Sequence, residues 1–199
     1  MEKCSDSISW VGGKMKNYFE YPIVPALRDE QQIKKALSCK ATSVFLLTGD
    51  IVDLQQIIQT FHNSSKFVFV HIDLVKGLGR DEAAVNFLKY QLKADGLITT
   101  KGNLVNMAKK IGLISIQRIF LLDSQSLITG IAQAKSHKPE YVEVLPGLIP
   151  DLLKQINDET SISVITGGLI KTVDQAKFAL ARGAIAVSTS EDSLWNISI

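Results

Sequence analysis

The sequence contains little cysteine, and its cysteines form no recognisable pattern. Cys4 and Cys39 are the two cysteines among 199 residues, and Cys4 lies in a polar segment near the N-terminus. Two isolated thiols cannot build a disulfide framework, and no spacing typical of a metal site is present. A cytoplasmic protein that needs neither a metal nor a cofactor is therefore expected.

Long hydrophobic runs and an excess of one charge are also missing. No apolar stretch approaches the roughly 20 residues that span a bilayer, so no membrane partner is expected. The N-terminus lacks the basic and apolar segments of a signal peptide. Lys and Arg number 22 against 20 acidic residues, a net charge of +2. This balance does not identify a nucleic-acid binder by charge, although it leaves room for a local basic face.

Short apolar runs alternate with longer amphipathic runs along most of the chain. The sequence is 46% hydrophobic, which is enough for one sizeable core. The runs expected to be strands are residues 23–26, 43–47, 67–72, 96–99, 114–119, 141–145, 163–165 and 184–187. The expected helices are residues 30–38, 53–61, 81–92, 103–110, 124–136, 148–157 and 173–181, before a short last segment at 190–195.

Strands that alternate with helices indicate a parallel sheet, and eight of them indicate closure into a small (β/α)8 barrel of the TIM type. A doubly wound open sheet is the alternative, but it usually has fewer strands, and no G-x-G-x-x-G follows the first strand. Residues 1–17 are polar and contain Gly12-Gly13, so we expect a flexible leader there. Residues 18–199 are then a single barrel domain.

Glycine and hydroxyl residues follow the last two expected strands. Gly167 and Gly168 come after the first of them, and Ser188 and Thr189 after the second. Turns from a strand into a helix leave backbone N–H groups that hold phosphate oxygens, and barrels often bind phosphate after strands 7 and 8. The sequence therefore predicts a phosphate site at these four residues. The structural alternative is that Gly-Gly only permits a tight turn.

Polar side chains interrupt the apolar pattern of three expected strands. His71 and Asp73 alternate with aliphatic residues along one strand, and Glu143 does so along another. Because successive side chains of a strand point to opposite faces of the sheet, the polar residues are expected to face away from the aliphatic ones. Gln117 follows the same reasoning, so these four side chains are expected to meet at the top of the lumen. A carboxylate is almost never buried unpaired, so Asp73 and Glu143 need partners or a ligand. His71 and Gln117 have the alternative of bonding a neighbour in a packed interior.

Several cations follow expected strand ends closely, and they predict a positive rim that contacts RNA or phosphate. The orientation of Arg118 is ambiguous, because Arg118 falls at the same alternate positions of its strand as the aliphatic residues. It needs an acid among the helices, or a bulge that turns it to the mouth. Scattered surface charge is the alternative for the whole set. These residues are Arg28, Arg80, Lys101, Arg118 and Lys171.

In order along residues 22–195, the chain resembles the glycerol-uptake operon antiterminator family. The loop after the fourth strand reads TTK where an STR-like run is expected, and the segment before Tyr18 has no counterpart. The motifs are PALRD at 25–29, FLLTGD at 45–50, VHIDL at 70–74, GLGRDE at 77–82, ADGLI at 94–98, KGN at 101–103, QR at 117–118, DS at 123–124, EVLPG at 143–147 and GGLI at 167–170.

The resemblance implies a barrel that responds to glycerol 3-phosphate and acts on the leader mRNA of glycerol-metabolism genes, preventing premature termination. Such a protein is a regulator without catalytic residues. RNA binding rests on the resemblance, because the chain contains no recognisable RNA-binding module. An isomerase or aldolase acting on a small phosphorylated metabolite is the alternative, and a barrel that binds nothing specific is a weaker one. A homodimer is the default expectation, since symmetric dimers are the commonest oligomers.

Overall fold

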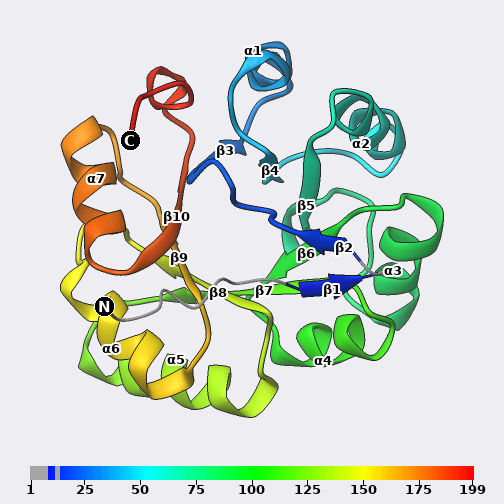
Figure 1. The fold of residues 1–199 in the computed structure, drawn as a ribbon. Coiled ribbons are helices and arrows are strands. Elements are labelled where there is room, and N and C mark those ends of the chain that lie inside the picture. The colour runs from blue at the N-terminus through cyan, green and yellow to red at the C-terminus, as the bar shows by residue number, and fades with distance from the viewer. Residues whose placement is uncertain (1–8, 12–13) are drawn as a thin grey trace.

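Eight parallel strands close into one barrel in the computed structural model, which describes residues 9–11 and 14–199. Around the barrel the order is β10-β3-β4-β5-β6-β7-β8-β9 (Figure 1). The predicted closed barrel is confirmed, and the open-sheet alternative is wrong. The strands are β3 (Ile23–Leu27), β4 (Ser43–Leu46), β5 (Phe67–His71), β6 (Gly96–Thr99), β7 (Ile114–Phe120), β8 (Tyr141–Leu145), β9 (Val164–Gly167) and β10 (Ala184–Thr189).

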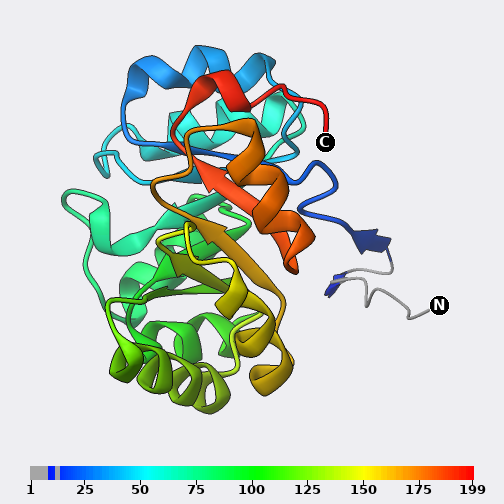
Figure 2. The same ribbon diagram turned by 90° about the vertical axis from the view of Figure 1, so that its left-hand side faces the viewer.

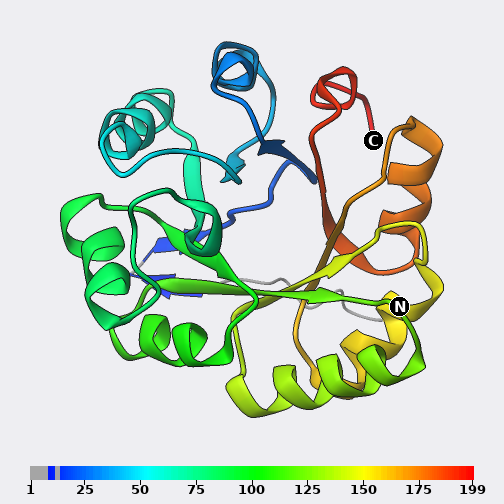
Figure 3. The same cartoon turned by 180° about the vertical axis from the view of Figure 1, so that it is seen from behind.

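Helices surround the barrel as an outer ring, which Figure 3 shows from the other end. The α-helices are α1 (Ile33–Ser38), α2 (Leu54–Asn63), α3 (Glu82–Asn86), α4 (Gly102–Lys110), α5 (Ser124–His137), α6 (Asp151–Thr160) and α7 (Val173–Ala181). Single turns of 3-10 helix form η1 (Glu30–Gln32), η2 (Ile72–Leu74) and η4 (Asp192–Leu194), and η3 (Phe87–Gln91) continues α3 as π-helix.

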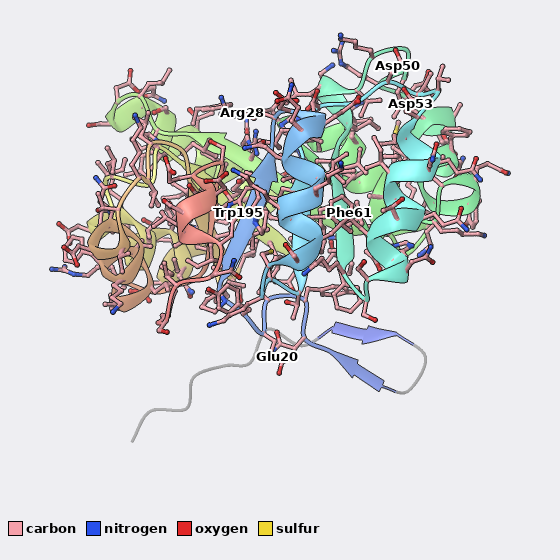
Figure 4. All side chains as sticks on the ribbon, turned by 90° about the horizontal axis from the view of Figure 1, so that it is seen from above. Glu20, Arg28, Asp50, Asp53, Phe61 and Trp195 are labelled. Atoms are coloured by element: carbon pink, nitrogen blue, oxygen red, sulfur yellow. The ribbon has the colours of Figure 1, made fainter. Side chains whose placement is uncertain are left out.

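A small antiparallel hairpin stands apart from the barrel sheet. It pairs β1 (Ser9–Val11) with β2 (Lys14–Lys16). Figures 2 and 4 show it at one end of the barrel, near Glu20. Both strands fall inside the segment that the sequence predicts as a leader. Residues 1–8 and 12–13 of that segment lie outside the described residues.

The ends of the last two strands differ from the sequence prediction in a way that matters for the site. Gly167 is the final residue of β9, and Ser188 and Thr189 end β10, so all three belong to the sheet. Ser188 pairs in register with Gly167. Only Gly168 of the four predicted phosphate residues lies in a turn.

Aromatic rings fill the amino-terminal half of the barrel lumen. Phe19 stacks on Phe69 at a centroid separation of 5.7 Å and meets Tyr141 edge-on at 5.1 Å. Phe45 and Tyr18 also pack edge-on against Phe69. All five side chains are buried. Such pairs add stability beyond their buried area, so this end of the barrel is a closed apolar plug.

A second and larger group of apolar residues lies between the strands and the helices. The large cluster between strands and helices includes Phe61 of α2 and Trp195, which follows η4 (Figure 4). The Trp195 indole Nε1 donates to the Thr189 carbonyl oxygen at 3.0 Å. This bond ties the C-terminal segment to the end of β10 and so fixes one wall of the mouth.

We predict that replacing Phe69 with Ala costs about 3–5 kcal/mol of unfolding free energy, because the cavity left behind cannot collapse in a close-packed lumen. Tyr90→Ala is the control, since that side chain is 51% exposed. Urea denaturation should show a loss below about 1 kcal/mol for the control. Equal losses in the two variants would contradict the assignment of the lumen as the main core.

Candidate functional site

A cleft of about 230 Å³ opens at the carboxyl ends of β9 and β10. Figure 4 shows Arg28, Asp50 and Asp53 at this end of the barrel, opposite Glu20 and the hairpin. The residues lining the cleft come from β3, β4 and β7 to β10 and the turns after them. They are Ala26, Arg28, Leu47, Arg118, Glu143, Leu145, Gly168, Leu169, Ile170, Lys171, Ser188, Thr189, Ser190 and Glu191.

The turn after β9 presents backbone donors to this cleft. Gly168 and Leu169 both have left-handed backbones, with φ of 74° and 64°. Successive N–H groups in such a turn form a concave surface that suits an anion. Within residues 14–199, no acceptor takes a hydrogen bond from the N–H groups of Gly168, Leu169 or Ser190. All three residues line the cleft.

The N-terminus of α7 does not supply the donors that the sequence argument expected from a helix. Thr172 Oγ1 accepts from the Gln175 N–H, while Gln175 Oε1 accepts from the N–H groups of Lys171 and Thr172. This capping box occupies the N–H groups of Lys171, Thr172 and Gln175. The residues of this region that line the cleft belong to the turn before the helix, from Gly168 to Lys171.

The predicted phosphate residues have different roles in the structure. A Cβ atom on Gly167 would lie 2.0 Å from Ser188 Oγ, so Gly167 permits close strand packing. The Ser188 hydroxyl donates to Glu143 Oε1 at 2.6 Å, and the Thr189 hydroxyl donates to the Ile170 carbonyl oxygen at 2.9 Å. Their hydrogens are used within the fold. Gly168, Ser188 and Thr189 line the cleft, and Gly167 does not.

A buried ion pair lies at the floor of the cleft. Arg118 Nε donates to Glu143 Oε2 at 2.7 Å, and the two side chains are 7% and 0% exposed. Arg118 faces the lumen with no register shift between β7 and β8, so the bulge considered from the sequence is not needed. The acid that Arg118 was expected to require is Glu143. The expectation that this acid lies among the helices is wrong.

The predicted inward orientation of Gln117 is also wrong. Its Oε1 lies 3.3 Å from His137 Nδ1, and its Nε2 lies 3.4 Å from Gln133 Oε1, both on α5. The alternation argument failed at β7 because Ile114 and Ile116 pack into the apolar lumen. An aliphatic set does not by itself identify the outer face, because aliphatic residues fill the lumen of this barrel as well.

His71 and Asp73 lie across the mouth, at the end of β5, and neither lines the cleft of the last two strands. His71 Nδ1 is 3.9 Å from Asp73 Oδ2. Burial lowers the pKa of His71 to about 4, helped by Arg118 and opposed by Asp73 and Glu143. His71 is therefore a neutral imidazole near pH 7.

The predicted cations do not form one cluster. Arg28 and Lys171 line the cleft. Arg80 is tied to the loop after β5, because its Nη2 donates to the Asp73 carbonyl oxygen at 2.7 Å. Lys101 is exposed at the N-cap position of α4. The structure thus brings Arg28, Arg118 and Lys171 together and leaves Arg80 and Lys101 on the rim.

Leu169 and Ser190 also line the cleft, although the sequence analysis did not include them among the phosphate residues. They directly follow the predicted turn residues, and neither side chain type indicates a site. Across residues 9–11 and 14–199, no group of three His, Cys, Asp or Glu residues could hold a metal ion. In the same part of the chain, no helix has the length and apolar character needed to cross a bilayer.

The fold and cleft define a (β/α)8 barrel with a polar, partly cationic mouth over its last two strands. The model of the glycerol-3-phosphate responsive antiterminator family matches residues 23–195. The chain belongs to this family, as the sequence resemblance implied.

Relatives of known structure agree with this assignment. A glycerol uptake operon antiterminator regulatory protein from Listeria monocytogenes is 35% identical, with 88% of this chain and 95% of that chain covered and a TM-score of 0.85. A glycerol uptake operon antiterminator-related protein from Thermotoga maritima is 36% identical, with 87% and 97% covered and a TM-score of 0.79. An uncharacterised Escherichia coli protein, YgcP, is 29% identical over 177 residues, 89% of this chain and 93% of that protein.

Barrel enzymes are related in fold alone. A putative deoxyribose-phosphate aldolase from Coccidioides immitis is 14% identical, with a TM-score of 0.65. This likeness extends over 86% of the chain and concerns the arrangement of strands and helices. It gives no support to an aldolase activity of this protein.

We predict that His71 makes stability fall in mildly acidic solution. An unfolded histidine titrates near pH 6.5, whereas folded His71 has a pKa of about 4. Between these values the unfolded state binds more protons, so His71 stabilises the fold fully above pH 6.5 and loses that contribution as pH falls towards 4. Urea denaturation of the wild type should show up to about 1.4 kcal/mol more loss per pH unit than His71→Asn between pH 6 and 5. The two slopes should be parallel between pH 7 and 8. Parallel slopes at acidic pH as well would contradict the prediction.

We also predict that Glu143→Gln costs about 3 kcal/mol of unfolding free energy, because it leaves the Arg118 charge buried without its partner. Arg118→Gln in the same chain should recover part of this loss, which a double-mutant cycle would measure. Glu159→Gln is the control, because its ion pair with Lys135 is solvent-exposed. A loss no greater than that of the control would mean that the buried pair is not a structural requirement.

Proposed function

We propose that this protein binds glycerol 3-phosphate in the mouth of its barrel and, in the bound state, binds the leader mRNA of glycerol-metabolism genes to prevent premature termination. The observation that carries the proposal is the cleft at the ends of β9 and β10, with unused N–H donors and cations, in a chain of the antiterminator family. The names of the Listeria and Thermotoga relatives agree with a role in glycerol uptake.

The phosphate is proposed to lie on the N–H groups of Gly168, Leu169 and Ser190, with Arg28 and Lys171 beside it. Hydrogen bonds between charged partners are shorter and about twice as strong as neutral ones. The Arg118–Glu143 pair under the cleft is internally neutralised. Glu191 also lines the cleft and offsets one of the two exposed cations, so one net positive charge remains to attract a dianion. A phosphate ester fits this arrangement better than a neutral sugar.

The RNA surface is proposed to be the rim that includes Arg80 and Lys101. Carboxylates at the same end are partly occupied as local caps: Asp81 accepts from the Ala84 N–H and Asp123 from the Ser126 N–H. Lys101 has no such capping role and is exposed. Cations on this rim can meet RNA phosphates, which makes affinity fall with salt.

Binding of the effector is tested by isothermal titration calorimetry with glycerol 3-phosphate. Arg28→Ala and Lys171→Ala should each weaken binding by about 10-fold or more, since a hydrogen bond to a charged group contributes about 1.5–3 kcal/mol. Lys93→Ala, which removes an exposed lysine near the amino-terminal end, should bind as the wild type does. Wild-type affinity in both cleft variants would contradict the phosphate position.

Incubation of the protein with glycerol 3-phosphate separates a regulator from an enzyme. A regulator should leave glycerol 3-phosphate unchanged over hours of incubation, as followed by ¹H and ³¹P NMR. Consumption of glycerol 3-phosphate, or turnover of a related triose phosphate, would favour the isomerase or aldolase alternative.

The RNA surface is tested with a transcript of the leader of a glycerol-metabolism operon. Arg80→Ala with Lys101→Ala should weaken binding and reduce the slope of log K against log salt by about 1.4, because each single-strand phosphate that is no longer neutralised lowers it by about 0.7. Glycerol 3-phosphate affinity should not change in Lys101→Ala alone, because the Lys101 side chain, unlike that of Arg80, forms no bond to Asp73. Lys93→Ala with Lys138→Ala is the charge-matched control at the other end of the barrel. An unaltered salt slope in the rim variant would move the RNA surface elsewhere.

A further inference from the structure

Two buried polar atoms in the mouth lack the partners that buried groups normally have. Within the part of the chain that the structure describes, His71 Nδ1 and Asp73 Oδ1 are the buried side-chain atoms without a hydrogen bond. The two side chains are 4% and 13% exposed. Leaving such a group unsatisfied costs about 1–3 kcal/mol, so the pair is expected to have a partner in the working protein.

The chain satisfies one oxygen of Asp73 and leaves the other. Oδ2 accepts from Thr99 Oγ1 at 2.8 Å and from the Thr100 N–H at 3.1 Å. Oδ1 has only the Arg80 Nε at 3.8 Å, which is ion-pair distance but not a hydrogen bond. The carboxylate is therefore held rigidly by one oxygen while the other stays available as an acceptor.

His71 complements this acceptor. Its Nδ1 lies 3.9 Å from Asp73 Oδ2, so the unpaired atoms of the two side chains belong to one small polar region. Because the pKa of His71 is lowered to about 4, the imidazole is neutral near pH 7 and Nδ1 can accept or donate a single hydrogen bond. A hydroxyl group, which donates one hydrogen and accepts others, matches such a pair of atoms.

This region faces the phosphate cleft across the mouth. Arg118 and Glu143 line the cleft, and the charges of both act on the pKa of His71. The Arg118–Glu143 ion pair at the floor of the mouth thus lies between the turn after β9 and the His71–Asp73 region. An anionic group and a hydroxyl on one ligand are the two groups that these regions would bind.

We propose that His71 Nδ1 and Asp73 Oδ1 form a hydroxyl-binding subsite that selects a polyol phosphate over a simple alkyl phosphate. The inference rests on the proposed function, which supplies the phosphate end of the ligand, and it assigns the recognition of the other end. The hydroxyl donates to Asp73 Oδ1 and bonds His71 Nδ1. Selectivity arises because an alkyl group would leave both buried atoms unpaired.

The test compares glycerol 3-phosphate with n-propyl phosphate, which has the same chain length and no hydroxyl. In calorimetric titrations the wild type should bind glycerol 3-phosphate about 10–100-fold more tightly. Asp73→Asn should lose most of this ratio while its affinity for n-propyl phosphate stays near that of the wild type. A variant that weakens both compounds equally, or that keeps the wild-type ratio, would overturn the subsite.

Asp95→Asn is the matched control. Asp95 also pairs with a histidine, His62 Nε2 at 2.8 Å, and its side chain is likewise 13% exposed. It immediately precedes β6, at the amino-terminal end of the barrel, and it should keep the wild-type ratio. The same loss of ratio in Asp95→Asn would also contradict the subsite, because the effect would then reflect general destabilisation.

A second measurement does not depend on a variant that folds. The imidazole signals of His71 in ¹H–¹⁵N NMR spectra of the wild type should shift on addition of glycerol 3-phosphate and not on addition of n-propyl phosphate. Equal shifts with both compounds, or none with either while both bind, would mean that the two atoms hold water only. If the wild type binds neither compound, the proposed function itself fails, and the subsite fails with it.

Discussion

The burial of one carboxylate constrains the whole mouth of this barrel. Glu143 is inaccessible to solvent, and a charge in that position must be paired and hydrogen-bonded. Arg118 therefore points into the lumen, which sends its neighbour Gln117 outwards to α5. Ser188 must donate to the second carboxylate oxygen, and its hydroxyl occupies the place that a side chain at position 167 would need. One buried charge thus accounts for the orientation of β7, the end of β10 and a glycine in β9.

The two ends of the lumen divide stability and recognition between them. The amino-terminal end is filled by aromatic rings, so packing there does not depend on the polar groups of the mouth. At the carboxyl end, the helix starts of α3, α5 and α7 are capped by the chain's own Asp81, Asp123 and Thr172. The turn after β9 and Ser190 have N–H groups that the chain does not use, and these residues line the cleft.

The regular part of the fold could be predicted from the sequence, because alternation of apolar runs and amphipathic runs leads directly to β/α repeats. The four residues offered as phosphate ligands lie at the carboxyl ends of β9 and β10, yet only Gly168 lies in a turn, since strand ends depend on register with neighbouring strands. The assumption that the aliphatic side chains of a strand face the helices held at β5 and β8, where Phe69 and Tyr141 point inwards. It failed at β7. There Ile116 is inward and Gln117 has partners on α5. Which side chains of a strand point into the lumen depends on the neighbouring strands and helices, and the sequence of a single strand does not encode these.

The acidic and basic groups of the mouth are committed in ways that suit binding better than proton transfer. Glu143 is held by Arg118 and Ser188, and Asp73 has one oxygen fixed by two donors. A general base works best with a pKa near the operating pH, whereas burial lowers the pKa of His71 to about 4. At neutral pH these groups act as fixed hydrogen-bond partners. A rigid, internally neutralised floor with donors at one side and an unsatisfied pair at the other favours a receptor for a small phosphorylated polyol, which agrees with a family of effector-responsive antiterminators.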